Sequence, residues 1–383
     1  MSSKAPHIVV AAGGTGGHMI PAHVLVEALK LRGWTATLLT DERGLKYPGL
    51  FEGCDRHVIP AASLGGKNPV VWAKSLATIL KGRSTARTLY RQHRPSLVAG
   101  FGGYPAFPAL LGALAEGVPT LIHDQNAVLG RVNRLLAGRV DAIATAYPNI
   151  QRLDPKHAAK VTLIGNPVRE DIVALRDQPY PPVDGVLQLL VVGGSQGATA
   201  LSRVIPLAIE RLSEEVRSRL SITQQCRPED VEQVADAYRR LGIPARTAAF
   251  IGDMANEIAK AHLVIARSGA STVAEMAVAG RPAIFVPLPT SMDNHQVFNT
   301  AELTKAGGAC MIHQADFTPE RLAPKLEGLF TKPETLATAA AAAKGVGRPD
   351  AGARLADLVE RLAGRAVSAP KPASNGIPLG VLA

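Results

Sequence analysis

Two glycine-rich segments, each directly after an apolar run, constrain the fold of this chain more than any other feature. The first is 13–17 (Gly-Gly-Thr-Gly-Gly), which follows 8–12, and the second is 193–197 (Gly-Gly-Ser-Gln-Gly), which follows 189–192. A glycine-rich turn between a strand and a helix lets backbone N–H groups approach an anion, and the helix N-terminus adds about half a positive charge. The repetition predicts a strand, loop and helix of one kind at the start of each half, with phosphate as the natural ligand.

Short runs rich in Val, Ile and Leu alternate with helical patterns along the whole chain. This alternation is typical of βαβ units and therefore of parallel sheets. The runs form two series, separated by the proline-rich stretch 174–186, where we expect a linker. Strands are predicted at 7–12, 35–40, 96–99, 119–122 and 142–145, and in the second series at 187–192, 220–223, 247–251, 263–266 and 283–286.

The length of the chain favours two domains, because 383 residues exceed what one hydrophobic core usually serves. A composition of 46% hydrophobic residues, with 36 Gly and 28 Pro, suits an α/β protein with many turns. We predict an α/β fold with two Rossmann-like, doubly wound parallel-sheet domains that face a cleft. Their predicted extents are 1–165 and 166–365, the second with closing helices at 336–344 and around Leu355, Leu358 and Leu362, followed by a disordered tail at 366–383.

Cysteine usage and hydropathy exclude several classes of protein. The three cysteines lie far apart without CxxC or Cys/His spacing, so neither a disulfide framework nor a zinc site is predicted. The longest uncharged stretch, 95–115, is interrupted by prolines and glycines, which disfavours a membrane span. The N-terminal residues lack the apolar stretch and cleavage site of a signal peptide. A cytoplasmic protein, soluble or peripheral to a membrane, is expected.

Positive charge is concentrated in one part of the chain. The net charge is +10, and 56–115 contains no Asp or Glu but eight Lys and Arg residues. This surface is expected to attract anions, although a solvated basic surface without function is equally consistent. Nucleic acid is not expected as a partner, because aromatic residues make up only 4% of the chain and no nucleic-acid-binding motif combines them with these charges.

His18 is the candidate general base. It stands where the first glycine-rich loop becomes a helix, and neutral imidazole can accept a proton near pH 7. The alternative is a structural role, in which His18 caps the following helix or hydrogen-bonds the loop.

A second candidate anion site is the segment 267–275 (Arg-Ser-Gly-Ala-Ser-Thr-Val-Ala-Glu), which follows a predicted strand and opens a helix. Glu275 can accept both hydroxyls of a ribose while the helix N-terminus faces a diphosphate, as a nucleotide-sugar requires. Alternatively, Glu275 only complements the dipole of a first helical turn. The metal-bridging sequence Asp-x-Asp is absent, so Arg169, Arg267 and helix N-termini are expected to neutralise a diphosphate instead. The polar segment 287–296 offers side chains for sugar hydroxyls.

Two alternatives come from other classes. A nicotinamide-dependent oxidoreductase is suggested by Asp41 at the end of the predicted strand 35–40, but neither loop has Gly-x-Gly-x-x-Gly in register with such a residue. A noncatalytic lipid- or RNA-binding module is the alternative outside enzymes.

A series of motifs resembles the MurG family, in order, over nearly the whole chain. They lie at 13–18 (GGTGGH), 101–104 (FGGY), 123–126 (HDQN), 165–169 (GNPVR), 193–198 (GGSQGA), 267–275 and 287–296. MurG enzymes are inverting GT-B transferases that move N-acetylglucosamine from UDP-GlcNAc to the C4 hydroxyl of N-acetylmuramyl-pentapeptide diphosphoryl-undecaprenol (lipid I), giving lipid II for peptidoglycan synthesis. The resemblance implies this fold and reaction, with His18 as the catalytic candidate. A lipid A disaccharide synthase or a UDP-GlcNAc epimerase is the alternative with the same fold.

The resemblance also assigns substrate contacts. Those implied for UDP-GlcNAc are the backbone of Ile251 on uracil, Glu275 on ribose, Ser195 with Ala270, Ser271 and Thr272 on the diphosphate, Arg169 on the donor, Asn126 and Gln296 on the sugar, and Thr15, Gly16 and Gly17 at the cleft. Those implied for the acceptor diphosphate are the loops with Gly13 and Gly14 and with Gly102, Gly103 and Tyr104. Two positions depart from the family: Asp124 replaces the common Glu, which puts the reach of that side chain in doubt, and His295 replaces the common Gln.

An undecaprenyl acceptor cannot leave the bilayer, so the resemblance implies a peripheral protein on the cytoplasmic face of the bacterial plasma membrane. UDP-GlcNAc, lipid I and anionic phospholipid are the implied partners, with no cofactor and no metal. One stretch has apolar residues at helical spacing beside basic ones, as an interfacial helix requires: Trp72, Leu76, Ile79 and Leu80, with Lys74, Lys81 and Arg83. The alternative is a surface helix packed on the core.

Overall fold

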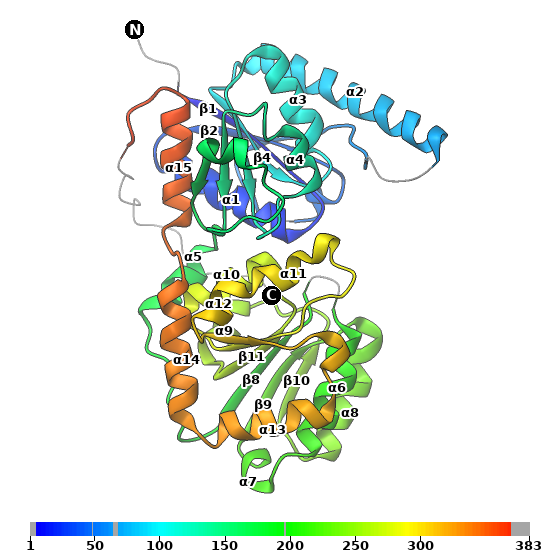
Figure 1. The fold of residues 1–383 in the computed structure, drawn as a ribbon, viewed down its shortest axis with the longest axis vertical. Coiled ribbons are helices and arrows are strands. Elements are labelled where there is room, and N and C mark those ends of the chain that lie inside the picture. Colours follow the sequence, from blue (N-terminus) through cyan, green and yellow to red (C-terminus); the bar gives the residue numbers. More distant parts are fainter. Residues whose placement is uncertain (1–4, 48, 64–67, 195–196, 369–383) are drawn as a thin grey trace.

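Two parallel β-sheets, stacked along the long axis of the molecule, form the framework of the structure (Figure 1). The computed structural model describes residues 5–47, 49–63, 68–194 and 197–368. The first sheet has seven strands in the order β3-β2-β1-β4-β5-β6-β7, and the second has six in the order β10-β9-β8-β11-β12-β13. All the strand pairs in these two sheets are parallel.

The first-sheet strands are β1 His7–Ala12, β2 Thr35–Thr40, β3 Asp55–Val58, β4 Leu97–Gly102, β5 Thr120–Asp124, β6 Ala142–Thr145 and β7 Val161–Leu163. The second-sheet strands are β8 Leu187–Val192, β9 Leu220–Gln225, β10 Ala245–Ala248, β11 Leu263–Ala266, β12 Ala283–Phe285 and β13 Ala309–Met311. The helices up to the linker are α1 Gly16–Lys30, α2 Pro69–His93, α3 Ala106–Glu116, α4 Arg131–Leu136 and α5 Glu170–Val173. Those that follow are α6 Thr199–Glu210, α7 Glu214–Arg217, α8 Val231–Arg240, α9 Met254–Lys260, α10 Ala270–Ala279, α11 His295–Asn299, α12 Ala301–Lys305, α13 Pro319–Phe330, α14 Pro333–Val346 and α15 Ala351–Leu362.

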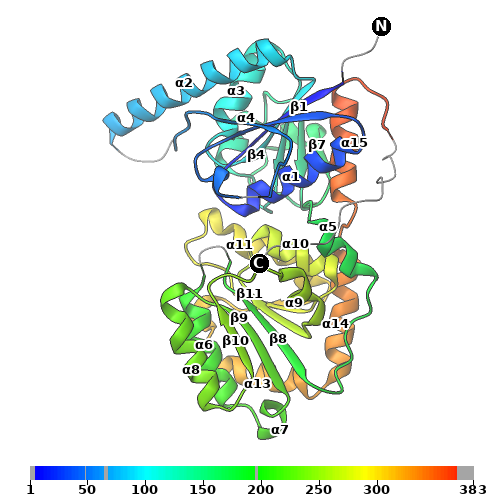
Figure 2. The ribbon, with the colours of Figure 1, turned by 180° about the vertical axis from the view of Figure 1, so that it is seen from behind.

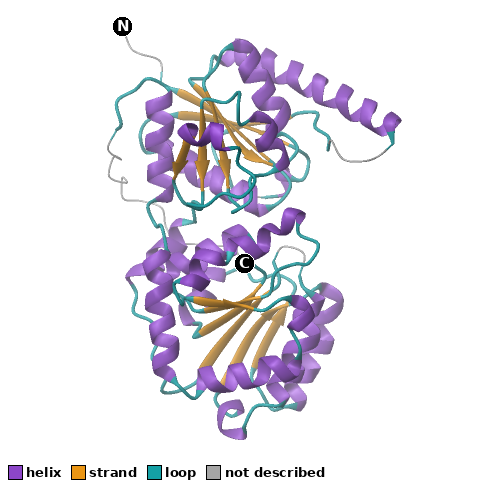
Figure 3. Ribbon diagram, viewed as in Figure 1, coloured by secondary structure: helices purple, strands orange, loops and turns teal. Residues whose placement is uncertain are grey.

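Helices cover both faces of the first sheet because its central strand is apolar on both (Figure 3). Ile8, Val10 and Ala12 of β1 pack with α1 and α15, whereas Val9 and Ala11 pack with α2, α3 and α4. Successive side chains of a strand point to opposite faces, so an uninterrupted apolar strand is stable only with cover on both sides.

The second sheet repeats this arrangement. Leu189 and Val191 of β8 face α6, α8 and α13, and Leu190 and Val192 face α9, α10 and α14. The predicted fold class, two doubly wound parallel-sheet domains, is confirmed.

The last helix returns from the second domain to the first. We expected both closing helices to pack on the second domain, predicted as 166–365. Helix α14 does, against α10, but α15 packs on the first domain, against α1. Leu355 and Val359 of α15 enter the core of the first domain. The Arg32 guanidinium lies 2.7 Å from Asp357 and 2.9 Å from the buried carboxylate of Glu360. The amphipathic pattern of this helix predicted a buried face, but not which domain would cover it. The predicted tail lies mostly outside the described residues.

Helix α2 extends away from the body of the first domain in both views (Figures 1 and 2). Its C-terminal part is anchored, since Ile79, Ala86 and Tyr90 are buried. Its first turns are exposed, including Val70, which is 60% accessible. Within the described ranges, no helix is both long and apolar enough to cross a bilayer.

Candidate functional site

The candidate site lies at the carboxyl ends of the strands of both sheets. The strand order reverses beside the first strand of each sheet, between β1 and β4 and between β8 and β11. Open α/β sheets bind ligands in the crevice at such a reversal. The loops at 13–17, 102–105 and 267–269 leave the sheets here. Gly193 and Gly194, which follow β8, lie at the same end of the second sheet. Ser195 lies outside the described residues, so its predicted contact with the diphosphate stays a prediction.

The N-termini of α1 and α10 face each other across the junction of the domains. A Cβ atom added to Gly17, in the first turn of α1, would lie 3.9 Å from Oγ of Ser271 in the first turn of α10. The Ser271 hydroxyl is buried and has no hydrogen-bond partner among the described residues. The first N–H groups of a helix lack intrahelical partners, so two positively polarised helix ends and a free hydroxyl converge here. This arrangement favours an anion.

The two glycine-rich loops of the first domain pack directly on each other. A Cβ atom on Gly103 would lie 2.5 Å from the carbonyl oxygen of Gly13, so this contact requires glycine. Gly102 has a φ of +99°, and a Cβ there would lie 2.8 Å from the imidazole of His18. The sequence predicted these loops as acceptor contacts, and the structure adds that they shape the space around His18.

Asp41 is occupied by protein groups. Its Oδ1 accepts hydrogen bonds from the backbone N–H groups of Gly14, at 3.1 Å, and Gly44, at 3.0 Å. Its Oδ2 pairs with Arg43 at 2.8 Å. The Gly14 N–H is therefore committed to Asp41 rather than to a ligand. Because an oxidoreductase would need this carboxylate for a ribose, the geometry disfavours the nicotinamide alternative.

Arg43 and Tyr104 form the rim of the site on the side of the first domain. The Arg43 guanidinium lies 5.2 Å from the centroid of the Tyr104 ring, a cation–π distance. Both side chains are about half exposed. Tyr104 was predicted from the motif, whereas Arg43 was missed because it lies in a loop without a recognisable pattern.

His18 lies in the first turn of α1 and hydrogen-bonds outside its own helix. Its Nδ1 is 3.1 Å from Oε1 of Gln125, in the loop after β5. Burial lowers the pKa of His18 from its usual 6.5, and the hydrogen bond to Gln125 and the charge of Asp124 only partly oppose this effect. The residue that caps α1 is Thr15, so the helix-capping alternative for the His18 ring is not observed. A neutral imidazole at this place can accept a proton.

Asp124 holds the loop that follows β5. Its buried carboxylate accepts hydrogen bonds from the backbone N–H of Asn126 at 3.1 Å and of Gly130 at 2.7 Å, and from Asn133 Nδ2 at 2.9 Å. The shorter side chain thus reaches two backbone donors of the loop after β5 and the side chain of Asn133 in α4. Because its oxygens are filled, Asp124 is a poorer candidate for the base than His18.

Asn126 lies at the contact between the domains. Its Oδ1 accepts a hydrogen bond from Nδ2 of Asn299, which ends α11, at 3.2 Å. The same Nδ2 donates to the Ser268 carbonyl at 3.1 Å. The amide of Asn126 is therefore held at the cleft, where a sugar contact was predicted. Asn299 was missed because it lies three residues beyond the polar segment 287–296.

Glu275 lies in the second turn of α10 and is partly exposed. The alternative that it complements the dipole of a first turn is wrong, because the first turn of α10 contains no acidic residue. Burial raises the pKa of Glu275 to about 7, an effect that the positive charge of Arg169 partly opposes. Arg169 itself lies 3.4 Å from Asp171. The side chain of Ile251 is buried in the same domain, so only its backbone is left for a ligand.

Arg267 does not face the site as expected. Its guanidinium donates to the carbonyl oxygens of Val286 at 2.9 Å and Pro287 at 3.2 Å, and to Oε1 of Gln314 at 2.6 Å. Arg267 therefore fixes the chain after β12, and Arg169 is the remaining arginine candidate for the diphosphate.

The segment after β12 folds into a fixed turn. Gln296 Oε1 accepts the Leu288 N–H at 2.9 Å, which leaves Nε2 of Gln296 for a ligand. His295 donates from Nδ1 to the Met292 carbonyl at 2.9 Å. Asp293 pairs with Arg134 of the first domain at 2.5 Å, so this turn also joins the two domains.

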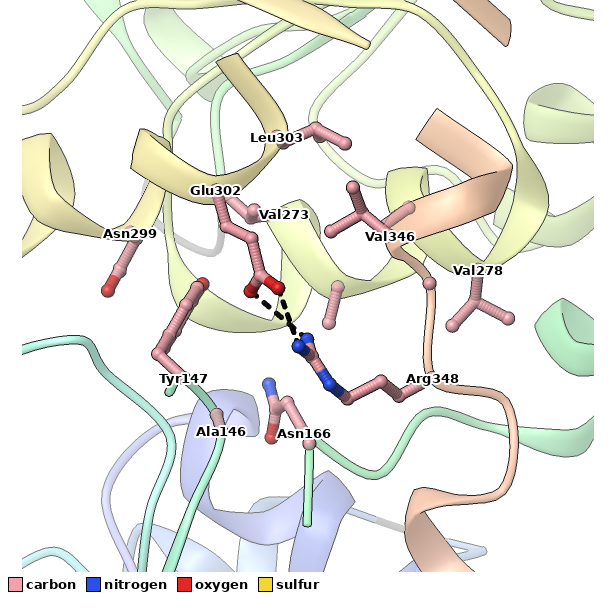
Figure 4. Close-up of a pocket in the computed structure, with 14 residues that line it drawn as sticks. Ala146, Tyr147, Asn166, Val273, Val278, Asn299, Glu302, Leu303, Val346 and Arg348 are labelled. Carbon is pink, nitrogen blue, oxygen red and sulfur yellow. Dashed lines mark hydrogen bonds and ion pairs between the residues drawn. The ribbon is translucent and has the colours of Figure 1, made fainter. Parts of the chain in front are cut away.

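A small cavity lies behind the site, where the domains meet (Figure 4). Tyr147 of the first domain and Asn166, directly after that domain, point into it, opposite the ion pair of Glu302 with Arg348, whose closest atoms are 2.5 Å apart. Neither polar atom of the Asn166 side chain has a partner among the described residues. The cavity volume of about 30 Å³ suits about two water molecules and is far too small for a nucleotide.

The predicted docking residues on α2 are mostly exposed. Trp72 is 47% exposed, and Leu76 and Leu80 are also exposed. Lys74 and Lys81 are exposed, and Arg83 is partly so. Ile79 is the correction: it is buried, because it lies on the same face of α2 as Ala86 and Tyr90, which anchor the helix.

The chain matches two family domains in sequence. Residues 8–145 match the glycosyltransferase family 28 N-terminal domain, and residues 188–361 match the glycosyltransferase family 28 C-terminal domain.

Similar proteins cover almost the whole chain. A "UDP-N-acetylglucosamine--N-acetylmuramyl-(pentapeptide) pyrophosphoryl-undecaprenol N-acetylglucosamine transferase" of Erythrobacter litoralis is 54% identical over 95% of this chain and 92% of its own. A protein of the same name from Zymomonas mobilis is 51% identical over 93% and 92%. Among solved structures, MurG of Acinetobacter baumannii is 32% identical, covers 93% of this chain and 99% of its own, and superposes with a TM-score of 0.74.

Proposed function

This chain belongs to glycosyltransferase family 28, and from that membership we propose that it transfers N-acetylglucosamine from UDP-GlcNAc to N-acetylmuramyl-(pentapeptide) pyrophosphoryl-undecaprenol. It is a glycosyltransferase of the MurG type with the GT-B fold. The product is lipid II, a precursor of peptidoglycan, and the second product is UDP.

One observation supports this assignment above the others, namely the facing N-termini of α1 and α10. His18 stands in the first turn of α1, and the free hydroxyl of Ser271 stands in the first turn of α10. A general base and an anion-binding helix end are thus held on opposite walls of one narrow space. A transferase that moves a sugar from a diphosphate to an alcohol needs a base for the alcohol and a stabiliser for the departing diphosphate.

The reaction follows from these positions. His18 accepts the proton of the acceptor C4 hydroxyl as that oxygen attacks the anomeric carbon of N-acetylglucosamine. The bond from the anomeric carbon to the diphosphate oxygen breaks, and its electron pair leaves with UDP. The N-terminus of α10 and Ser271 stabilise the negative charge that develops on the diphosphate. Attack from the face opposite UDP inverts the configuration at the anomeric carbon.

The donor lies mainly against the second domain. Glu275 accepts hydrogen bonds from the ribose hydroxyls, the backbone at Ile251 contacts uracil, and Arg169 together with 270–272 contacts the diphosphate. Helix amides, a hydroxyl and one guanidinium supply the positive potential, so we propose catalysis without a metal ion.

The acceptor is held by the first domain at a membrane surface. The exposed Trp72, Leu76 and Leu80 of α2 suit the interface of a bilayer, and Lys74 and Lys81 suit its anionic headgroups. We place the protein as a peripheral protein on the cytoplasmic face of the plasma membrane.

A turnover assay tests the function directly. The full chain is incubated with UDP-GlcNAc and a short-chain lipid I analogue, and the products are identified by mass spectrometry. We expect stoichiometric UDP and a disaccharide product, with both products dependent on the acceptor. Conversion of UDP-GlcNAc to an epimeric sugar without acceptor would instead indicate an epimerase and would overturn the proposal.

A further inference from the structure

His18 is the end of a chain of hydrogen bonds that begins at a backbone carbonyl where the first domain ends. The Gly165 carbonyl oxygen lies 3.0 Å from Nε2 of His123. Nδ1 of His123 lies 3.0 Å from Nε2 of Gln125, and Oε1 of Gln125 lies 3.1 Å from Nδ1 of His18. His123 is fully buried and Gln125 is 3% exposed, so neither exchanges these partners for water.

The direction of each hydrogen bond in this chain is fixed by chemistry. A carbonyl oxygen only accepts, so Nε2 of His123 must carry a hydrogen and donate it to Gly165. Burial lowers the pKa of His123 to about 4, so this imidazole is neutral near pH 7 and its Nδ1 is an acceptor. The side-chain amide of Gln125 must then present its NH₂ group to His123.

A second contact fixes the Gln125 amide independently. Its Nε2 also lies 3.0 Å from the carbonyl oxygen of Phe101, which can only accept. The opposite orientation of the amide would place Oε1 against this oxygen, so it is excluded. Oε1 therefore faces His18, and because this oxygen only accepts, Nδ1 of His18 must carry the hydrogen.

We infer that His123 and Gln125 are positioning residues, which hold His18 as the Nδ1–H tautomer and so reserve its Nε2 lone pair for the acceptor hydroxyl. The inference rests on the proposed role of His18 as the base. In a neutral imidazole one nitrogen donates and the other accepts, so fixing Nδ1 as the donor makes Nε2 the only basic atom. Gly102 completes the arrangement, since a Cβ there would displace the ring.

The tautomer is measured in the full chain labelled with ¹⁵N-histidine, by two-bond ¹H–¹⁵N correlation near pH 8. His262 is an internal reference, because its Nδ1 accepts the Gln188 N–H at 2.9 Å and its Nε2 donates to the Pro182 carbonyl at 2.9 Å. We expect His123 and His262 to show the Nε2–H pattern and His18 to show Nδ1–H. The His18 signals are identified by their loss in His18→Ala. An Nε2–H pattern for His18 in the wild type overturns the inference.

The variant Gln125→Leu removes the amide and keeps the side chain's bulk. We expect His18 to become a mixture of tautomers while His262 does not change, and kcat to fall by about 10- to 100-fold, less than the 10²- to 10⁴-fold typical for loss of a base. In a His18→Ala background the same change should cost no further activity, because both substitutions act through one group. The matched control is Gln224→Leu, which removes another fully buried amide, bonded to Tyr238 in the second domain. It should leave the His18 tautomer and kcat unchanged.

Gln125→Glu provides a readout that a purely structural role would not change. A carboxylate beside Nδ1 still accepts its hydrogen but raises the pKa of His18, so the acid limb of the kcat/KM profile should move to higher pH. The groups that already influence His18 are Gln125, Asp124, the Phe101 carbonyl, His123 and His295, and none of the others is altered in this variant. An unmoved acid limb contradicts the inference.

The results separate this inference from the proposed function. If His18 is Nδ1–H and loses that state in Gln125→Leu, but His18→Ala retains kcat, the positioning of His18 by Gln125 is confirmed and its assignment as the base is wrong. If His18→Ala loses kcat while Gln125→Leu leaves the tautomer of His18 unchanged, His18 remains the base and its positioning by Gln125 is wrong. Should Gln125→Leu not fold, the tautomer of the wild type alone decides.

Discussion

Asn299 of α11 accepts a hydrogen bond from the backbone N–H of Ala127 at 2.9 Å, across the junction between the two domains. Its Nδ2 donates to the Ser268 carbonyl and to Oδ1 of Asn126. The side chain is fully buried. One amide thus joins the loop after β5 to the loop after β11, and it sets the spacing of the two walls between which His18 and Ser271 stand.

Asn299→Ala should lower the free energy of unfolding by about 1 to 3 kcal/mol, because the buried N–H of Ala127 loses its acceptor. Urea unfolding of the full chain measures this. Asn256→Ala is the matched control, since Asn256 is an exposed asparagine of α9, and its change should stay within about 0.5 kcal/mol. Equal midpoints for the two variants would contradict the bridging role.

The ionised carboxylate of Glu275 should lower the free energy of unfolding but strengthen the binding of UDP. Its pKa in the folded protein is raised to about 7 by burial, above the ordinary 4.5, so the folded state binds this proton more tightly than the unfolded state. The contribution to stability is therefore fully present below pH 4.5 and is lost as the pH rises through about 7. Glu275→Gln, which cannot ionise, should be more stable than the wild type at pH 8 by about 1 to 2 kcal/mol.

The same variant should bind UDP more weakly, by about 1 to 3 kcal/mol, because a charged acceptor for the ribose is lost. Calorimetry with UDP and urea unfolding at pH 5 and pH 8 measure the two effects. Glu210→Gln, on the exposed end of α6, is the control and should change neither. Unaltered UDP affinity would remove Glu275 from the donor site.

The central strands were predictable from sequence, but three of the four edge strands were not; the fourth, β10, was predicted at 247–251 and lies at Ala245–Ala248. The bounds of β1, β2, β6, β8 and β11 agree with the predicted ranges, because strands covered on both faces are continuous apolar runs. The three strands that were missed, β3, β7 and β13, are all edges of their sheets. An edge strand is short and only partly covered, so its sequence, such as Asp55–Val58, lacks an apolar run.

The site was predictable where the backbone carries the chemistry, and less so where side chains meet across the fold. Gly13, Gly102 and Gly103 stand out in sequence because the backbone conformation and close packing require glycine there. Arg43 and Asn299 carry no such mark, since their roles depend on residues far away in sequence. For the same reason the commitment of Arg267 to Val286, Pro287 and Gln314 was not foreseen.

His18→Ala should lower kcat by about 10² to 10⁴-fold. Leaving-group stabilisation by α10 remains, so activity should not vanish. UDP-GlcNAc affinity and the melting temperature should stay near those of the wild type, because the His18 ring hydrogen-bonds Gln125 of the same domain and lies outside the proposed UDP contacts. Single-turnover kinetics with the lipid I analogue separate the chemical step from binding. Near-full kcat in the variant would mean that the base is another group.

Catalysis should persist in excess EDTA. The proposed diphosphate contacts are the N-terminus of α10, Ser271 and Arg169, whose donors need no bridging cation. The initial rate with UDP-GlcNAc and the lipid I analogue is compared with and without chelator, and again after magnesium or manganese is added in excess. Complete loss of turnover that either metal restores would refute this account of the donor site.

Vesicle binding should depend on α2 and should be visible through one tryptophan. The sequence contains two tryptophans; Trp34 is buried, at 4% exposure, whereas Trp72 is 47% exposed on the projecting part of α2. Insertion of Trp72 among lipid headgroups moves it to a less polar environment, so anionic vesicles should shift the emission to shorter wavelength, and Trp72→Ser should abolish that shift. Attraction of anionic lipid contributes about 1 kcal/mol for each nearby Lys or Arg.

Charge reversal at Lys74, Lys81 and Arg83 should therefore weaken flotation with anionic vesicles by at least about 100-fold, and more in low salt than in high salt. The control reverses three exposed lysines of the second domain, Lys260, Lys305 and Lys332, which gives the same net charge on a surface away from α2. If both triple variants float less than the wild type and to the same extent, net charge rather than the position of α2 governs binding. If both float as well as the wild type while Trp72 emission does not shift, α2 is not the docking surface.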